Sequence, residues 1–188
     1  MDRYYIERFL AAERQAIRGR VLEVLDAGYT ERFGTGVESS DVLDIDSSNS
    51  SATIVADLGS ADDVPSETFD CFVLTQTLQY IYDLQSAVGH VQRILRPGGT
   101  VLCTVPTVSR IARGTPDTEY WRLTQAGCRR LFADAFTGGT VEARSYGNVL
   151  TAVAFLIGMA AEELSTSELE LVDPFFPLLV TVKATKTA

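Results

Sequence analysis

The chain has 188 residues, of which 46% are hydrophobic, and its formal net charge is -9 at pH 7. This length supports one well-buried core and is short for two ordinary domains, so residues 1–188 are predicted to form a single domain. The acidic balance argues against nucleic acid and anionic membrane surfaces as partners, because binding to phosphate groups ordinarily relies on a basic face.

The sequence predicts neither export nor membrane insertion. Charges in the first twenty residues are spaced through a helical pattern, and no basic segment precedes an apolar core. The longest nearly uncharged stretch, Val149 to Ala161, is shorter than the roughly 20 residues that a membrane-spanning helix needs. A cytoplasmic location is therefore expected.

Cysteine and histidine are sparse, which argues against a metal site. Cys71 and Cys103 lie inside apolar runs typical of strands, and Cys128 shares no metal-type spacing with them. Free cysteine behaves as a small hydrophobic residue, so burial is the expected role. The only histidine, His90, falls on a predicted helix away from the strand ends, and no metal ligand is predicted.

In chain order, the first half alternates predicted helices and strands. Apolar residues at helical spacing predict a helix over residues 3–17, and short apolar runs predict strands at 20–24, 41–45 and 53–56. A brief helical or turn segment at 29–33 follows the first strand. A strand at 69–74 and a helix at 84–95 precede the run Arg96-Pro97-Gly98-Gly99, where proline cannot continue a helix and glycine permits a reversal.

The second half continues the pattern, with strands predicted at residues 100–105, 141–146 and 178–184 and helices at 125–136 and 150–163. Nearly continuous apolar strands that alternate with helices are typical of a parallel sheet covered on both faces, so the predicted class is α/β. The helix at 150–163 has more than one apolar stripe, which predicts burial on more than one side. Packing on the sheet is favoured. A wall of an apolar substrate pocket and a homodimer interface through Asn148 to Glu163 are alternatives.

One stretch carries a specific resemblance to a known family. It begins with Phe69-Asp70, an apolar strand and Leu74-Thr75-Gln76, and after a helix reads Arg93-Ile94-Leu95-Arg96-Pro97-Gly98-Gly99-Thr100-Val101-Leu102. This order resembles the class I S-adenosylmethionine-dependent methyltransferases, in particular small methyltransferase type 11-like proteins. The resemblance implies a Rossmann-like three-layer sandwich whose seven-stranded, mostly parallel sheet has the order 3-2-1-4-5-7-6. It also implies that residues 1–18 form an N-terminal helix, or lid, over the crevice.

The same resemblance implies S-adenosylmethionine as the cofactor and places its binding residues at the strand ends. Asp44, with Asp46 as the alternative, is similar to the acid that accepts hydrogen bonds from both ribose hydroxyls. Asp57 with Leu58 resembles the pair that contacts the adenine. The remaining candidates, beside the methionyl part and the methyl group, are Thr75 and Gln76. Each aspartate also suits the simpler role of a turn residue.

The family's first motif, E/D-x-G-x-G-x-G, is altered in this chain. Its glycines let the backbone approach the cofactor closely. Glu23 fits the acidic position, and Glu23 and Asp26 are expected to contact the cofactor, but other residues replace the glycines: Leu25, Ala27 and Tyr29. Leu25 is expected to put a branched side chain close to where cofactor lies. The ordinary site is therefore altered or lost.

The predicted function is methyl transfer from S-adenosylmethionine to an oxygen or nitrogen of a small-molecule acceptor, in bacterial secondary or sugar metabolism. Such catalysis depends mostly on alignment, because the sulfonium is already activated. Candidates for a direct catalytic role are Gln76, Tyr80 and Tyr120. Two alternatives stay open: a catalytically silent subunit that binds a partner enzyme, and a methyltransferase fold recruited to another reaction such as a cyclisation.

Overall fold

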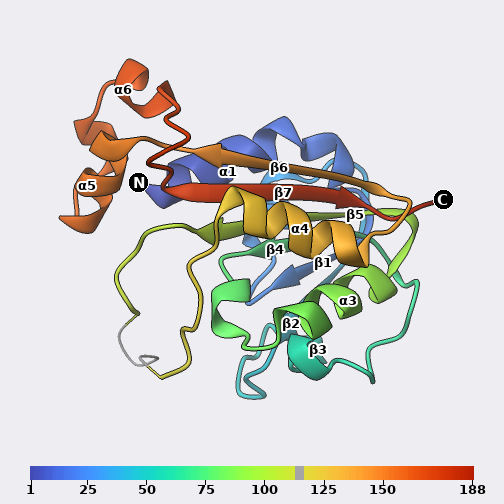
Figure 1. The fold of residues 1–188 in the computed structure, drawn as a ribbon. Helices are drawn as coiled ribbons and strands as arrows, with labels where there is room; N and C mark the ends of the chain where they lie inside the picture. The colour runs from blue at the N-terminus through green and yellow to red at the C-terminus, as the bar shows by residue number, and fades with distance from the viewer. Residues whose placement is uncertain (113–116) are drawn as a thin grey trace.

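A seven-stranded sheet forms the centre of the computed structural model, which describes residues 1–112 and 117–188 (Figure 1). The strand order is β3-β2-β1-β4-β5-β7-β6, and β7 is antiparallel to both of its neighbours. The predicted order is confirmed. The strands are β1 (Gly19–Val24), β2 (Val37–Asp44), β3 (Ile54–Val55), β4 (Phe69–Thr75), β5 (Leu95–Pro106), β6 (Thr140–Tyr146) and β7 (Leu179–Thr185).

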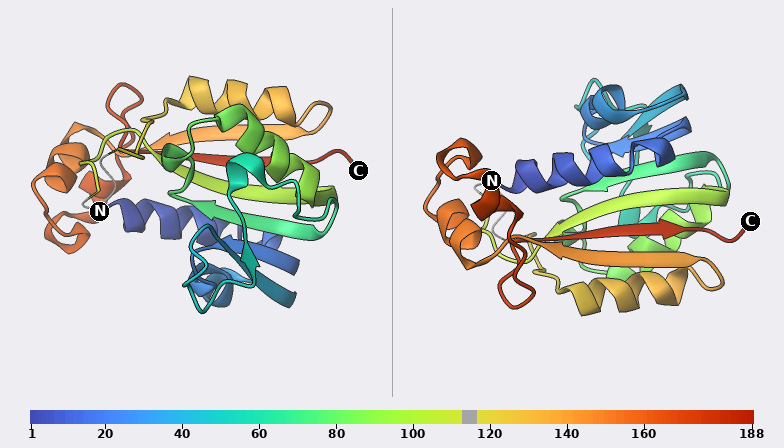
Figure 2. Two further views of the ribbon diagram at one scale, coloured as in Figure 1. Left: turned by 90° about the horizontal axis from the view of Figure 1, so that it is seen from below. Right: turned by 90° about the horizontal axis from the view of Figure 1, so that it is seen from above.

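Helices cover both faces of the sheet, which confirms the predicted three-layer α/β architecture (Figure 2). On one face lies α1 (Asp2–Ala12), whose apolar stripe, including Phe9 and Leu10, is buried. On the other lie α3 (Leu84–Ile94) and α4 (Gln125–Ala135), which bury residues such as Val91 and Phe132. The central strands β4 and β5 are therefore apolar on both sides, as expected of a covered parallel sheet.

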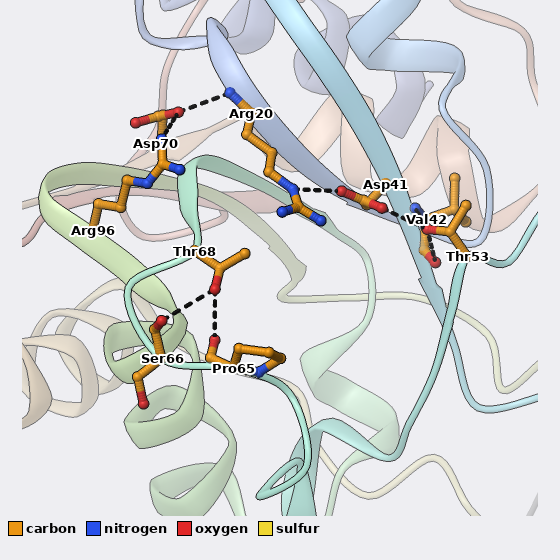
Figure 3. Close-up of polar contacts among 9 residues, drawn as sticks. All are labelled: Arg20, Asp41, Val42, Thr53, Pro65, Ser66, Thr68, Asp70 and Arg96. Atoms are coloured by element: carbon orange, nitrogen blue, oxygen red, sulfur yellow. Dashed lines mark hydrogen bonds and ion pairs between the residues drawn. The ribbon is translucent and has the colours of Figure 1, made fainter.

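Polar contacts join the strands at their amino ends, the edge opposite the crevice described below (Figure 3). The Arg20 guanidinium lies 2.8 Å from the Asp41 carboxylate, and the Asp70 carboxylate accepts from the Arg20 N–H at 2.8 Å and pairs with Arg96 at 2.9 Å. A side chain at Gly19 would meet the Asp70 carboxylate at 2.4 Å, so this position requires glycine. The ion pairs are half-exposed and contribute little stability individually, but together they connect four strands.

The connection from β2 to β3 is short and contains no helix. Residues 45–53 form turns, with hydrogen bonds from Ser48 N to Asp46 Oδ1 and from Ser51 N to Asn49 Oδ1. Side chains of Asp, Asn and Ser that accept from the backbone two residues on are typical of such turns. On this side the crevice is therefore bounded by a loop, and β3 is only two residues long.

The prediction of a buried helix over residues 150–163 is wrong in length and in burial. Helix α5 (Val149–Leu156) ends before Gly158, whose φ of +84° takes the chain out of the helix, and two short helices follow: η4 (Ala161–Glu163) and α6 (Thr166–Glu170). Val153 is 50% exposed and Ile157 70% exposed. The helix extends past the end of the sheet, so most of its apolar surface has no layer to pack against in the described chain (Figure 1).

The remaining elements are short. They are η1 (Arg14–Ala16), α2 (Gly28–Phe33), η2 (Leu58–Ser60) and η3 (Leu78–Tyr80). The N-terminal helix is thus shorter than predicted. Helix α3 ends at Ile94, one residue before its predicted end, and β5 starts at Leu95, so the run Arg96 to Gly99 lies within the strand and forms no reversal. In the described ranges, no helix is both long and apolar enough to cross a membrane.

Candidate functional site

An open crevice of about 1440 Å³ lies at the carboxyl ends of β1, β2 and β4. In a parallel sheet, these ends meet beside the point where strand order reverses, and that is where such folds bind ligands. Nine of the residues that the sequence nominated for the site line this one crevice: Glu23, Asp26, Asp44, Asp57, Leu58, Thr75, Gln76, Tyr80 and Tyr120. Asp46, the alternative to Asp44, is not among the lining residues.

Asp44, the last residue of β2, presents a carboxylate that is already oriented by the protein. Its Oδ1 accepts from Asp46 N at 3.0 Å, and its Oδ2 accepts from the Asn49 side-chain amide at 2.6 Å. Each oxygen has a second acceptor direction, because a carboxylate offers about four lone-pair sites. Two hydroxyl groups of a ligand in the crevice can therefore still donate to the Asp44 carboxylate. The Asp46 carboxylate instead accepts from Ser48 N, and this bond lowers its pKa.

Asp57 and Leu58 form the turn that follows β3. The Asp57 Oδ1 accepts from Gly59 N at 2.8 Å and caps η2, which leaves its other oxygen exposed at the crevice. Leu58 is 4% exposed and belongs to the core, so its backbone is held firmly beside the crevice. The turn interpretation of Asp57 and a binding interpretation are therefore compatible, since the cap uses only one carboxylate oxygen.

Glu23 and Asp26 hold the backbone of the altered glycine motif. The Glu23 carboxylate is 1% exposed and accepts from Tyr29 N at 3.0 Å and Thr30 N at 2.7 Å, in the first turn of α2. Burial raises the pKa of this carboxyl, while the hydrogen bonds from Thr30 and Tyr29 lower it. The Asp26 Oδ1 accepts from Gly28 N at 2.7 Å. These acids thus shape the loop between β1 and α2, where glycines do so in the family motif.

Leu25 stands at the first glycine position and adopts a conformation that favours glycine. Its φ is +72°, and a 2.9 Å bond from Asp26 N to Val24 O closes a γ-turn around it. This form of the γ-turn is rare and strained, and such a sparsely populated backbone conformation costs about 1–3 kcal/mol. The Leu25 side chain is 65% exposed and lines the crevice, which stays open beside it. The replacement therefore alters this part of the crevice without closing it.

Thr75 and Gln76 mark the end of β4. Gln76 has a φ of +49°, and its N–H donates to Thr104 O at 2.9 Å, which ties the strand end to β5. The Gln76 side-chain amide lies 3.3 Å from the buried Thr104 hydroxyl. Positive φ in a residue other than glycine is often found at functional sites. Two such residues, Leu25 and Gln76, lie on this crevice.

The N-terminal helix α1 forms one wall of the crevice and is fastened on two sides. Asp2, Arg3, Ile6 and Glu7 line the crevice. Glu7 pairs with Arg32 of α2. On the opposite side of the helix, the buried Tyr5 hydroxyl donates to Leu169 O at 2.8 Å and Arg8 pairs with Glu170 at 2.7 Å.

Aromatic side chains border the opposite wall. Tyr80, Tyr82 and Tyr120 line the crevice, and the rings of Tyr82 and Tyr120 meet edge to face with centroids 5.3 Å apart. Trp121 packs beside Tyr82 at 6.0 Å and donates from its indole nitrogen to Ile81 O. Tyr80 and Tyr120 thus line the crevice, whereas Trp121 makes a structural hydrogen bond.

The described lining of the crevice is strongly acidic. Asp2, Glu7, Glu23, Asp26, Asp44, Asp57 and Asp83 face only two basic residues, Arg3 and Arg32. A concave surface lined by one sign of charge attracts ligands of the opposite sign. The crevice therefore favours a ligand that carries positive charge over an anionic one.

Metal ligands and reactive thiols are not brought together in the described ranges, 1–112 and 117–188. Groups of three or more His, Cys, Asp or Glu residues able to hold a metal ion do not occur there. Burial raises the pKa of Cys71 and of Cys128 to about 12 and that of Cys103 well above its usual value. As expected, all three cysteines are buried, and they act as packing residues.

Comparison with known proteins agrees with this geometry. A family profile described as a methyltransferase domain matches residues 4–138, which contain β1 to β5 and every candidate site residue. The chain belongs to the methyltransferase-domain family. The resemblance to class I S-adenosylmethionine-dependent methyltransferases is thereby confirmed, and S-adenosylmethionine is the cofactor of that family. No curated protein was found to match the sequence.

Several solved structures have the same fold as this methyltransferase-domain protein. One is a complex of the Haloferax volcanii Trm112 methyltransferase activator with a methyltransferase, at 19% identity over 100% of this chain and 92% of that chain, TM-score 0.66. Another is an S-adenosylmethionine-dependent methyltransferase from Mesorhizobium loti, with 16% sequence identity over 94% of this chain and 95% of that chain and a TM-score of 0.64. The [4+2]-cyclase SpnF matches with 16% sequence identity over 97% of this chain and 81% of that chain and a TM-score of 0.61. At these identities the likeness is one of fold.

Sequence reasoning missed residues at the crevice and beside it. Asn49, which does not line the crevice but contacts both Asp44 and the Leu25 carbonyl, stands in a run of serines that looks like an ordinary turn. Asp83 and Tyr82 follow η3, and Asp83 is recognisable in sequence only as the N-cap of α3, which it is. No periodicity or motif distinguishes these residues, because their role depends on which loops meet across the sheet.

Proposed function

We propose that this protein binds S-adenosylmethionine in the crevice and transfers its methyl group to an oxygen or nitrogen of a small-molecule acceptor, in bacterial secondary or sugar metabolism. The observation that carries the proposal is the convergence of nine nominated residues on one open crevice at the carboxyl ends of the strands. Family membership over residues 4–138 supports the reaction class. The acidic lining supports a cationic ligand, and S-adenosylmethionine carries a sulfonium.

The residues of the crevice fit this cofactor. Asp44 would accept the two ribose hydroxyls on the oxygen directions that Asp46 and Asn49 leave open. Asp57 would accept from the adenine amine through its uncapped oxygen, with the Leu58 backbone beside it. Thr75, Gln76 and the loop held by Glu23 and Asp26 would border the methionyl part.

When bound, the cofactor would supply an activated methyl group, which an acceptor lone pair would take as the carbon–sulfur bond breaks to leave neutral S-adenosylhomocysteine. The protein's own task is alignment and removal of the acceptor proton. Tyr80 and Tyr120 line the crevice, and Gln76, which also lines it, directly follows β4. These residues would orient the acceptor, and the proton would pass to a neighbouring carboxylate or to water.

Helix α1, within residues 1–18, would act as a lid over bound ligand. Its crevice-lining residues Arg3 and Ile6 support this role, and its ties to Arg32 and Leu169 would have to loosen for it to open. A conformational step of this kind would exclude water from the reacting atoms.

The direct test is methyl transfer with a radiolabelled methyl donor and a panel of neutral and cationic small molecules. Transfer of label to an amine or hydroxyl acceptor, abolished by loss of cofactor binding, is the expected result. The fold is shared with the [4+2]-cyclase SpnF, so product mass must be measured as well. A product without added methyl mass would favour a recruited fold, and absence of cofactor binding would favour a silent subunit with a partner enzyme.

A homodimer through the surface around α5 is the second element of the proposal. We define this surface by its exposed apolar residues: Val149, Leu150, Val153, Leu156, Ile157, Leu171, Val172, Phe175 and Phe176. From their exposed fractions we estimate on the order of 900 Å², close to the ~800 Å² that each partner buries in a standard interface. Patches this large are unusual on monomers. A second copy would cover them.

Sedimentation equilibrium tests this homodimer. Acidic residues such as Glu163 and Asp173 border the surface, so dimerisation is expected to strengthen with salt, which screens their repulsion. The V153D/I157D double variant is expected to be monomeric, while a D134N control on α4 stays dimeric. A monomeric wild-type protein at high concentration and high salt would contradict the proposal.

A further inference from the structure

Asn49 connects the altered glycine loop after β1 to the Asp44 carboxylate at the end of β2. Its side-chain amide donates to Leu25 O at 2.7 Å and to Asp44 Oδ2 at 2.6 Å. Leu25 is the strained residue at the end of β1, and Asp44 ends β2. One amide group therefore links the turn that replaces the first glycine to the acid nominated for ribose.

The orientation of the Asn49 amide is determined by its partners. Its oxygen accepts from Ser51 N at 2.9 Å, and both amide hydrogens point to acceptors. A flipped amide would bring the oxygen against the Leu25 carbonyl and the Asp44 carboxylate, which are both acceptors, so the hydrogen-bond network excludes it. Asn49 is itself anchored by its N–H, which donates to Asp46 O at 3.1 Å.

The conformation of Leu25 needs such a restraint. With φ at +72° in a γ-turn, this residue persists only where its surroundings hold it. Its N–H continues the sheet by donating to Leu43 O at 3.0 Å, and its C=O is held by Asn49. Both the N–H and the C=O of Leu25, the groups on either side of its strained φ and ψ angles, are therefore hydrogen-bonded.

We propose that Asn49 is a positioning residue for the cofactor: it holds the Leu25 turn open without glycine and orients the Asp44 carboxylate toward the ribose hydroxyls. This inference rests on the proposed function, because it assigns Asn49 a role in the same crevice. It explains how a chain that lacks the glycines of the first motif keeps an open crevice. Asn49 acts through Asp44 and Leu25 and touches no reacting atom.

The test measures ribose discrimination, which general destabilisation would not change. S-adenosylhomocysteine and its 2′-deoxy analogue are titrated calorimetrically into wild type, N49A and the matched control S50A, an exposed residue of the same loop. In wild type, S-adenosylhomocysteine should bind about tenfold more tightly than its 2′-deoxy analogue, as expected for one hydrogen bond to a charged group. In N49A this ratio should fall toward one, and S50A should keep it.

A second measurement tests the turn independently of cofactor. Urea unfolding of wild type, L25G, N49A and L25G/N49A forms a double-mutant cycle. Because glycine removes the strain, N49A should lower the unfolding midpoint less in the L25G background than in wild type.

The outcomes separate the two claims. An unchanged ribose ratio in N49A, or equal losses of both ligands, would overturn the orienting role, and additive unfolding effects would overturn the restraint on Leu25. If wild type bound neither ligand, the proposed function and the cofactor role would fail together, while the unfolding cycle would still decide whether Asn49 restrains the turn.

Discussion

Replacement of Asp44 tests the cofactor site at its best-defined side chain. The carboxylate is half-buried, and each of its oxygens already accepts one hydrogen bond from the protein. Two ribose hydroxyls would add one bond to each oxygen. Hydrogen bonds to charged groups contribute about 1.5–3 kcal/mol each, and we take the lower value because this site is open to water.

On that basis D44N, which keeps the shape but can accept on one atom only, should weaken S-adenosylhomocysteine binding by roughly tenfold. D44A removes both acceptors and should weaken it by roughly a hundredfold. Isothermal titration measures both constants. D46N is the matched control, because Asp46 lies two residues on but does not line the crevice; it should bind nearly as wild type does.

The reasoning would be refuted if D44A bound S-adenosylhomocysteine with unchanged affinity, or if D46N lost as much affinity as D44N. The second result would move the ribose role to Asp46, the alternative that the sequence left open. Circular dichroism of each variant separates loss of binding from loss of fold.

Three further predictions concern the lid, the α5 region and the cysteines. Y5F removes the buried bond to Leu169 O and should destabilise the protein by about 1 kcal/mol, measured by urea unfolding, with faster ligand release in stopped flow. N148A removes the cap of α5 and two bonds to the carbonyls of Glu168 and Leu171, and should cost about 3 kcal/mol; a stability equal to wild type would contradict this. The cysteine pKa values are raised, so their reactive thiolates are scarce at pH 8, and the native protein should resist alkylation until it unfolds.

Much of the fold could be predicted because its signals are local. The apolar runs of β1, β4 and β5 indicate a covered parallel sheet, and the family resemblance, carried in part by the run Arg96 to Gly99, supplies the order of its strands. The placement of the candidate acids could be predicted for the same reason: Asp44 ends β2, Asp57 lies two residues after β3, and parallel strands bring their carboxyl ends to one edge.

Other features depend on tertiary placement and could not be predicted. The apolar residues of α5 predicted burial, but whether a helix lies on the sheet or beyond its end is not encoded in its own periodicity. The contacts of Asn49 arise because the loop after β2 reaches the end of β1. The altered glycine motif predicted a changed site, and the hydrogen bonds of Glu23 and Asn49 explain how the crevice remains open.

Titration of the wild-type protein with S-adenosylmethionine and S-adenosylhomocysteine tests the central claim most directly. We predict one-to-one binding of both, roughly micromolar, with S-adenosylmethionine gaining more than the neutral product as salt is lowered, because the crevice is acidic. Absence of binding heat, together with an unchanged melting temperature at high ligand concentration, would contradict a cofactor site at the carboxyl ends of these strands.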